Sequence, residues 1–142
     1  MKDIKFRTTK NIEKEKLLAL YSDAGWSAYT SRPDLIKKAV GNSLYILTAW
    51  EGEKLIGMLR AVGDGLTIIY IQDLILLKKY KRKGIGSLML KKILEKYSNV
   101  RQIVLLTDSD KELITFYERS GFKRTDRSGL CSFIRIKNMP DN

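Results

Sequence analysis

The spacing of apolar residues along the chain predicts a series of amphipathic helices and short strands. Apolar side chains recur every three or four positions in residues 13–24 and again in residues 85–97, which is the period of a helix with one buried face. Residues 67–77 form a nearly continuous apolar run, typical of a strand covered on both faces. The other expected elements are strands at residues 2–8, 43–50, 55–62, 101–107, 122–125 and 131–136, and helices at residues 31–40 and 111–120.

Turn residues separate these elements and set their order. The polar turn at residues 51–54 joins two expected strands as a hairpin. Ser109 and Glu112 have the spacing of a capping box at the start of a helix, and Gly121 ends that helix. The resulting order, β-α-α-β-β-β-α-β-α-β-β, predicts a mixed α/β fold. A chain of 142 residues without a repeat or linker predicts one domain over residues 1–142.

The composition narrows the class of protein. With 44% apolar and 30% charged residues, the chain is expected to fold into a globular domain. Its apolar runs are shorter than the roughly 20 residues of a membrane span and no signal-peptide pattern opens it, so no membrane is expected. The one cysteine, Cys131, cannot form an intrachain disulfide, and a cytoplasmic location is expected. The chain contains no histidine, which excludes a histidine base and argues against a zinc site.

The strongest local signal is a basic, glycine-punctuated turn between the run 67–77 and the helix 85–97. The net charge of +11 predicts attraction to an anionic ligand or partner. Removing the five basic residues around the turn still leaves +6, so the excess is also spread over the chain. Gly84 and Gly86 let the backbone approach a ligand, and the helix N-terminus favours an anion. The five basic residues are Lys78, Lys79, Lys81, Arg82 and Lys83.

Two segments together resemble the GNAT superfamily of N-acetyltransferases. Residues 81–86, Lys-Arg-Lys-Gly-Ile-Gly, are similar to the family's Arg/Gln-x-x-Gly-x-Gly/Ala loop, with Lys81 where Arg or Gln is usual. Residues 116–122, Phe-Tyr-Glu-Arg-Ser-Gly-Phe, resemble its Phe-Tyr-x-x-x-Gly-Phe segment. The order of elements also matches that family, so the resemblance covers nearly the whole chain. It implies a GNAT-like fold, with a central mixed, mostly antiparallel sheet and helices on both faces.

The resemblance implies acetyl-CoA as co-substrate and no metal. By position, Asp110 stands where family members often carry an Asn that touches the cofactor. Tyr117 matches the family tyrosine that protonates the departing thiolate, and packing in the core is the alternative for this side chain. The residues matching the pantetheine strand are Leu74, Ile75 and Leu76, and those matching the pyrophosphate loop are Lys81, Arg82, Lys83, Gly84, Ile85, Gly86 and Ser87.

The general base and the acceptor site are less defined by the resemblance. At the positions of the family's glutamate bases the chain has Tyr70 and Leu105, so neither assignment transfers. Asp73, within the apolar run, is the nearest carboxylate to serve as base, and a hydrogen-bonded carboxylate at the end of a strand is the alternative. Trp26 and Tyr29, in the loop that commonly lines the acceptor pocket, either contact the acceptor, for instance through a cation–π contact, or cap the core.

The expected function is acetyl transfer from acetyl-CoA to a primary amine on a small molecule or peptide. Two alternatives remain: a catalytically silent domain that binds acyl-CoA, and a basic nucleic-acid-binding module. The second is not favoured, because the basic cluster contains only one aromatic residue, Tyr80, and no RNA-binding signature is present. Related proteins often form dimers through terminal strands, so residues 131–136 offer an edge for a possible homodimer.

Overall fold

The computed structural model describes residues 3–138, which form two compact units. The first unit ends at Leu106 and contains the sheet, and the second begins at Thr107. The expectation that residues 1–142 make a single domain stays a prediction.

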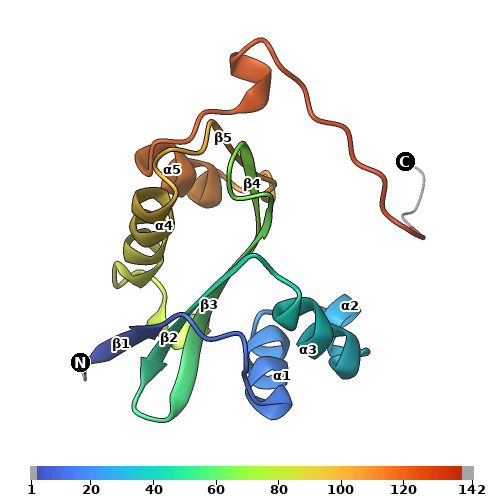
Figure 1. The fold of residues 1–142 in the computed structure, drawn as a ribbon, viewed down its shortest axis with the longest axis vertical. Helices are drawn as coiled ribbons and strands as arrows, with labels where there is room; N and C mark the ends of the chain where they lie inside the picture. Colours follow the sequence, from blue (N-terminus) through green and yellow to red (C-terminus); the bar gives the residue numbers. More distant parts are fainter. Residues whose placement is uncertain (1–2, 139–142) are drawn as a thin grey trace. The chain divides into compact units, whose positions relative to one another are not determined.

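The first unit is built on one five-stranded sheet whose strands lie in sequence order (Figure 1). The first four strands pair with their neighbours in antiparallel fashion, and the last two pair in parallel. The predicted mixed and mostly antiparallel sheet is therefore confirmed. The strands are β1 (Ile4–Arg7), β2 (Tyr45–Glu51), β3 (Lys54–Gly63), β4 (Ile68–Leu76) and β5 (Gln102–Leu105).

Helices cover both faces of this sheet, as the sequence predicted (Figure 1). On one face, α1 (Lys14–Asp23), α2 (Ser27–Thr30) and α3 (Pro33–Gly41) enclose an apolar cluster that includes residues from β2, β3 and β4. On the other, α4 (Ile85–Lys96) is amphipathic and turns a buried apolar stripe towards the strands. Burying each large apolar side chain contributes about 1.5–3 kcal/mol. The buried side chains of that stripe are Ile85, Met89, Leu90 and Ile93.

The second unit contains α5 (Lys111–Arg119) and the chain that follows it. The predicted capping residue, Ser109, is wrong by one position. Asp110 is the N-cap, because its Oδ1 accepts a hydrogen bond from the Glu112 N–H at 2.9 Å. At the other end, the Phe122 N–H donates to the Tyr117 carbonyl, and Gly121 adopts φ +95°. This positive φ explains why the helix ends on a glycine.

The last two predicted strands, at residues 122–125 and 131–136, are wrong. No strand is assigned between residues 122 and 138, and residues Thr125–Arg127 instead form a short 3-10 helix, η2. An alternation of apolar and polar residues suits a strand with one buried face, but a strand also needs a neighbouring main chain to pair with. Among residues 3–138, no strand pairs with this segment. The dimer edge expected at residues 131–136 is therefore absent as a strand, and the homodimer stays a prediction.

Two further short helices were not expected. The loop predicted between the first two helices contains α2, a single turn, and a 3-10 helix, η1 (Lys78–Tyr80), follows β4. No helix within residues 3–138 is long and apolar enough to cross a membrane.

Candidate active site

A bulge in β4 marks the centre of the candidate site. Arg60 of β3 pairs with Asp73 and the next residue of β3, Ala61, pairs with Ile71, so Gln72 is an extra residue in β4. Bulges of this kind bend a strand and redirect side chains, and they are frequent beside active sites. The bulge also separates two parts of β4 that differ in their pairing.

Beyond the bulge, β4 loses its neighbour on the β5 side. The parallel pairing with β5 ends at Ile71 and Leu105, whereas β4 continues to Leu76. The Leu77 N–H donates to the Ile56 carbonyl of β3 at 2.9 Å. Main-chain groups in an antiparallel pair alternate in direction, so those of Ile75 point towards β3, as do those of Leu77.

The main-chain groups of the intervening residues, Leu74 and Leu76, therefore point to the unpaired side. Of the three residues predicted to contact pantetheine, these two have N–H and C=O groups that are not paired with a strand within residues 3–138, and Ile75 does not. Their side chains are partly exposed, and the side chain of Ile75 is buried. The unpaired edge is defined as the β5 side of Leu74 and Leu76.

The chain then enters the loop that was predicted to bind pyrophosphate. Arg82 has φ +63° and Gly84 has φ +83°, so two left-handed residues alternate in this turn. For a non-glycine residue such as Arg82 this conformation costs about 1–2 kcal/mol. A Cβ placed on Gly84 would meet nothing within 4 Å, so glycine is needed there for its backbone and not for space. Strained turns of this kind cluster at ligand sites.

The loop leads into an N-terminus of α4 that has no side-chain cap. Gly84 is the N-cap residue, and the first helical hydrogen bond runs from the Leu88 N–H to the Gly84 carbonyl at 3.1 Å. The N–H groups of Ile85, Gly86 and Ser87 precede it and have no acceptor within the helix. These N–H groups and the helix dipole make a site for an anion.

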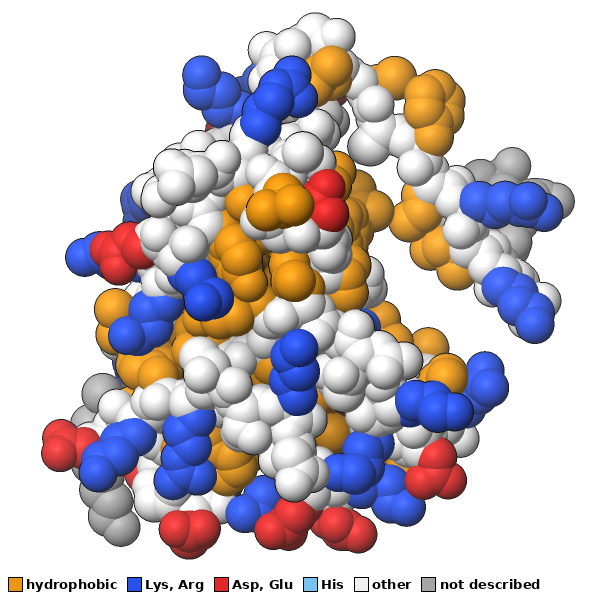
Figure 2. Space-filling model, viewed as in Figure 1, with side chains coloured by type: hydrophobic (Ala, Val, Ile, Leu, Met, Phe, Trp, Pro, Cys, Tyr) orange, Lys and Arg blue, Asp and Glu red, His pale blue; other side chains and the backbone are white. Residues whose placement is uncertain are grey.

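Basic side chains are not confined to this loop. Lys81, Arg82 and Lys83 are exposed beside the α4 N-terminus. Figure 2 shows further Lys and Arg side chains spread over the visible face, mixed with acidic ones. The excess of +11 is therefore both local and general.

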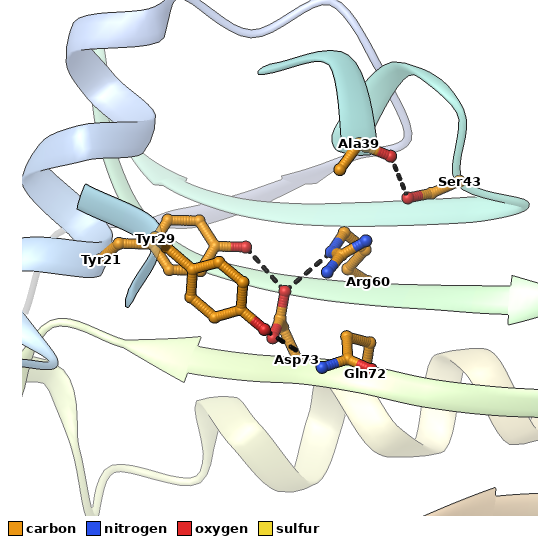
Figure 3. Close-up of polar contacts among 7 residues, drawn as sticks. All are labelled: Tyr21, Tyr29, Ala39, Ser43, Arg60, Gln72 and Asp73. Carbon is orange, nitrogen blue, oxygen red and sulfur yellow. Dashed lines mark hydrogen bonds and ion pairs between the residues drawn. The ribbon is translucent and has the colours of Figure 1, made fainter. Parts of the chain in front are cut away.

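Asp73 lies in a buried polar network on the face of the sheet that α1 covers (Figure 3). Its Oδ2 accepts a hydrogen bond from the Tyr21 hydroxyl at 2.7 Å and one from Arg60 Nε at 2.7 Å. The side chain of Asp73 is 1% exposed and that of Arg60 is 10% exposed. Asp73 Oδ1 is buried and has no hydrogen-bond partner among the described residues. The alternative for Asp73, a hydrogen-bonded carboxylate at the end of a strand, is thus confirmed for the hydrogen bonds and wrong for the position, because Asp73 lies within β4.

The pKa values of the two partners reflect this network. Burial and the neighbouring Asp73 charge both raise the pKa of Tyr21. Burial alone lowers the pKa of Arg60, but the Asp73 carboxylate outweighs it and the net pKa is raised. Tyr21 therefore stays a neutral donor and Arg60 stays a cation across the physiological range.

An aromatic group adjoins this network. The rings of Tyr21, Trp26 and Tyr29 lie 5.1–6.1 Å apart, centre to centre, and Trp26 and Tyr29 are partly buried against the apolar cluster under α1–α3. The Tyr29 hydroxyl accepts a hydrogen bond from Gln72 Nε2 at 3.2 Å and points towards the bulge (Figure 3). Trp26 and Tyr29 thus pack on the core while keeping part of their surface exposed, and their contact with an acceptor stays a prediction.

The other predicted site residues, Tyr117 and Asp110, belong to the second unit. The ring of Tyr117 packs edge-on against Phe116 at 5.0 Å and Phe122 at 5.9 Å. Burial raises its pKa to about 12, so its hydroxyl is protonated at neutral pH and able to donate. The carboxylate of Asp110 caps α5, which occupies one of its oxygens.

Sequence reasoning missed the two partners of Asp73. Tyr21 is 52 residues from Asp73 in the chain and Arg60 is 13 residues away. One signal was available: an arginine and an aspartate, each inside an apolar strand, are expected to pair because an unpaired charge is costly to bury. No group of three or more acidic, cysteine or histidine side chains within residues 3–138 is arranged to hold a metal.

Comparison with known proteins identifies the family. A family model described as an acetyltransferase (GNAT) domain matches residues 9–140. A GNAT family acetyltransferase from Streptococcus pneumoniae TIGR4 is 30% identical, with a TM-score of 0.85 over 96% of this chain and 100% of that chain. A probable acetyltransferase from meticillin-resistant Staphylococcus aureus is 26% identical, with a TM-score of 0.77 over 94% and 100% of the two chains.

More distant structures share the fold alone. AAC(6')-Iy, solved in complex with the bisubstrate analogue CoA-S-monomethyl-acetylneamine, is 13% identical, with a TM-score of 0.71 over 95% of this chain and 99% of that chain. No curated protein sequence matches this chain.

Proposed function

This chain belongs to the GNAT family of acetyltransferases, and on that premise we propose that it transfers an acetyl group from acetyl-CoA directly to a primary amine. The family makes it an acyltransferase. One observation carries the proposal for this chain: the unpaired edge of β4 runs directly into the left-handed turn and uncapped helix N-terminus at Gly84. The edge has main-chain N–H and C=O groups that can bind amides of a ligand, and the helix N-terminus has N–H groups that can bind phosphates.

Each of these two features is proposed to bind a different part of acetyl-CoA. The N–H and C=O groups of Leu74 and Leu76 hold the amides of the pantetheine arm as a neighbouring strand would. The N–H groups from Lys83 to Ser87 hold the diphosphate, aided by the α4 dipole and the charge of Arg82. Lys81 and Asp110 belong to the same predicted set.

The acceptor amine has to lose a proton before it attacks. An alkylamine with a pKa of about 10.4 is only about one part in 2,500 neutral at pH 7, a handicap of roughly 4.6 kcal/mol. We assign the acceptance of that proton to Asp73 Oδ1, directly or through one water, because this oxygen is buried beside the bulge and lacks a partner among the described residues.

Asp73→Asn tests this role because it keeps the shape of the side chain and removes the base. If Oδ1 accepts the proton, kcat falls by about 10²–10⁴-fold and the shape of the pH–rate profile changes. Urea unfolding of the same variant measures its structural contribution separately. A variant that unfolds more easily but has an unchanged pH–rate profile would leave Asp73 with the ion pair only.

Tyr117 is assigned to the leaving group. The thiolate of CoA resembles a thiol of pKa about 8.5, so it needs a hydrogen-bond donor of modest strength. A partly buried hydroxyl whose pKa is raised to about 12 is protonated at any physiological pH and supplies that donor. Packing between Phe116 and Phe122 fixes its orientation within the second unit.

The acceptor is proposed to be a small molecule or a peptide that carries a primary amine. The partly exposed faces of Trp26 and Tyr29 give its alkyl or ammonium part a surface for stacking or cation–π contact. The exposed Cys131 suits a reducing compartment, and the cytoplasm is the location we propose.

The experiment that tests the function has two stages. Calorimetry measures the binding of acetyl-CoA to the full chain, and thiol release is then followed with a panel of amines that includes polyamines, amino acids, aminoglycosides and peptides. Binding followed by amine-dependent thiol release supports the proposal. Absence of binding at millimolar acetyl-CoA refutes it.

A catalytically silent acyl-CoA-binding domain is the second candidate. It is favoured by the ion pair that already occupies Asp73 and by the lack of a glutamate at Tyr70 and Leu105. Binding of acetyl-CoA without thiol release by any amine of the panel would select this candidate.

A further inference from the structure

Three lysines converge on one buried tyrosine next to the predicted pyrophosphate loop. The ring of Tyr80, which is 5% exposed, has the ammonium groups of Lys79, Lys83 and Lys54 at 5.5, 5.7 and 6.0 Å from its centre. The three come from η1, from the loop and from the start of β3, all within the first unit. We call Lys54, Lys79 and Lys83 the Tyr80 cluster.

The lysines of the Tyr80 cluster have no ion-pair partner within residues 3–138. Carboxylates do lie nearby: Glu51 accepts a hydrogen bond from the Tyr80 hydroxyl at 2.9 Å, Asp23 accepts one from the Lys78 N–H at 2.8 Å, and Asp23 and Glu53 line the adjoining cavity. Their charges offset that of the lysines only in part, because the three lysines of the cluster and the nearby Lys78 and Lys16 outnumber them.

Two of the ammonium groups lie close enough to disfavour each other. The neighbouring Lys79 lowers the pKa of Lys54, and the charges of Glu51 and Asp23 offset this only in part. Ammonium groups that lie close to one another beside the same tyrosine ring are stabilised when an anion lies between them. A bound anion would therefore relieve an existing repulsion.

The cluster also borders open space. Lys54 and Lys79 line a cavity of about 660 Å³ between α1, the β2–β3 hairpin and η1, whose apolar wall includes Leu55 and Leu77. All three ammonium groups are on exposed side chains, so a ligand reaches them without any rearrangement of the core.

We propose that the Tyr80 cluster is the subsite for the 3'-phosphate of CoA. Lys83 belongs both to the cluster and to the loop assigned to the diphosphate, and in CoA the two phosphate groups are carried by the same ribose. The positive charge of the cluster therefore lies beside the loop proposed to bind the diphosphate, where the 3'-phosphate of the same CoA molecule is expected. This inference rests on the proposed function, because it concerns how the same co-substrate is recognised.

The subsite makes a difference that calorimetry measures without any turnover. CoA and 3'-dephospho-CoA differ only in the phosphate, so the ratio of their dissociation constants isolates the subsite. The wild-type chain is expected to bind CoA about tenfold more tightly, the size of two or three exposed ion pairs acting together. The preference should shrink at high salt, since exposed charges are screened.

The double variant Lys54→Gln/Lys79→Gln is expected to abolish this preference. Its dissociation constant for CoA rises to that of 3'-dephospho-CoA, which itself changes by less than about twofold. Lys38→Gln is the matched control, because this exposed lysine on α3 carries the same charge and lies outside the cluster. The control variant should keep the preference, and circular dichroism checks that each variant is folded.

The outcomes separate this inference from the proposed function. Equal binding of both ligands by the wild-type chain, or a preference that survives in the double variant, overturns the subsite and leaves the acetyltransferase proposal standing. Binding of neither ligand refutes the proposed function and the subsite with it. Loss of the preference in Lys38→Gln as well would show a general charge effect and would also overturn the subsite.

Discussion

Replacing Arg60 by Met should leave the Asp73 carboxylate buried without its cation. The ion pair is short, 2.7 Å, and almost fully enclosed, with 10% and 1% of the two side chains exposed. At an effective dielectric constant of about 20, the attraction at this distance is about 6 kcal/mol, and the desolvation of both charges offsets much of it. Removing one partner of such a pair typically destabilises a protein by about 3–5 kcal/mol.

The expected loss is large for a domain of this size, whose total free energy of unfolding is about 5–15 kcal/mol. Urea unfolding followed by circular dichroism measures it as a fall in the midpoint at constant slope. The triple variant Arg60→Met/Asp73→Leu/Tyr21→Phe removes all three polar groups and should recover at least about 2 kcal/mol relative to Arg60→Met, because no unpaired charge or donor is left.

Two results would refute this reasoning. If Arg60→Met costs less than about 1 kcal/mol, the carboxylate is not as enclosed as the geometry indicates, or water reaches its free oxygen. If the triple variant is as unstable as Arg60→Met, the loss comes from packing and not from the unpaired charge. In both cases the loss of stability could not be ascribed to an unpaired, buried carboxylate.

Three further predictions concern the loop and the second unit. Gly84→Ala should cost about 1–2 kcal/mol in stability or the equivalent roughly 5- to 30-fold in CoA affinity, because an alanine is unfavourable at its φ of +83° although its Cβ meets nothing within 4 Å. Gly41→Ala is the control, because a Cβ there also meets nothing within 4 Å and φ is not positive. An equal effect of both substitutions would contradict the prediction. Tyr117→Phe should lower kcat while the calorimetric CoA affinity stays within about twofold, and unchanged turnover with chemistry as the limiting step would exclude the donor role. Burial raises the pKa of Tyr117 from its ordinary value of about 10 to about 12, so its contribution to the free energy of unfolding is complete below pH 10 and is lost as the pH rises to about 12. In urea unfolding at alkaline pH, Tyr117→Phe should therefore lose less stability between pH 10 and 12 than the wild-type chain does. An unchanged dependence of stability on pH would contradict this prediction.

Several elements that the sequence predicted correctly have a pattern that is long or sharply ended. The helix α4 shows an apolar stripe over three turns and begins at a glycine, and β2 and β3 are joined by a short polar turn. The run containing β4 was recognised from its apolar character alone. Residues 131–136 show a comparable pattern, but whether they pair depends on a neighbouring strand, which the pattern does not encode.

Likewise, some parts of the candidate site could be predicted from the sequence and others could not. Gly84 and the loop around it form a local motif, so their positions follow from consecutive residues. The partners of Asp73 depend on the register of β3 against β4 and on the placement of α1, because Tyr21 lies 52 residues away in the chain. The bulge at Gln72, which changes which residues face each other, leaves no mark in the sequence that propensity reasoning detects.

The unpaired edge of β4 has a consequence for selectivity. Leu74 and Leu76 present hydrogen-bonding groups two residues apart, a repeat of about 6.8 Å that any extended polyamide matches. Such an edge cannot tell a pantetheine arm from a stretch of peptide, and by itself it would accept either as an added strand. We expect discrimination to come from the charged turn at its end, which favours a ligand that carries a diphosphate. If the co-substrate binds along this edge as proposed, it would also keep the edge from pairing with other polypeptides.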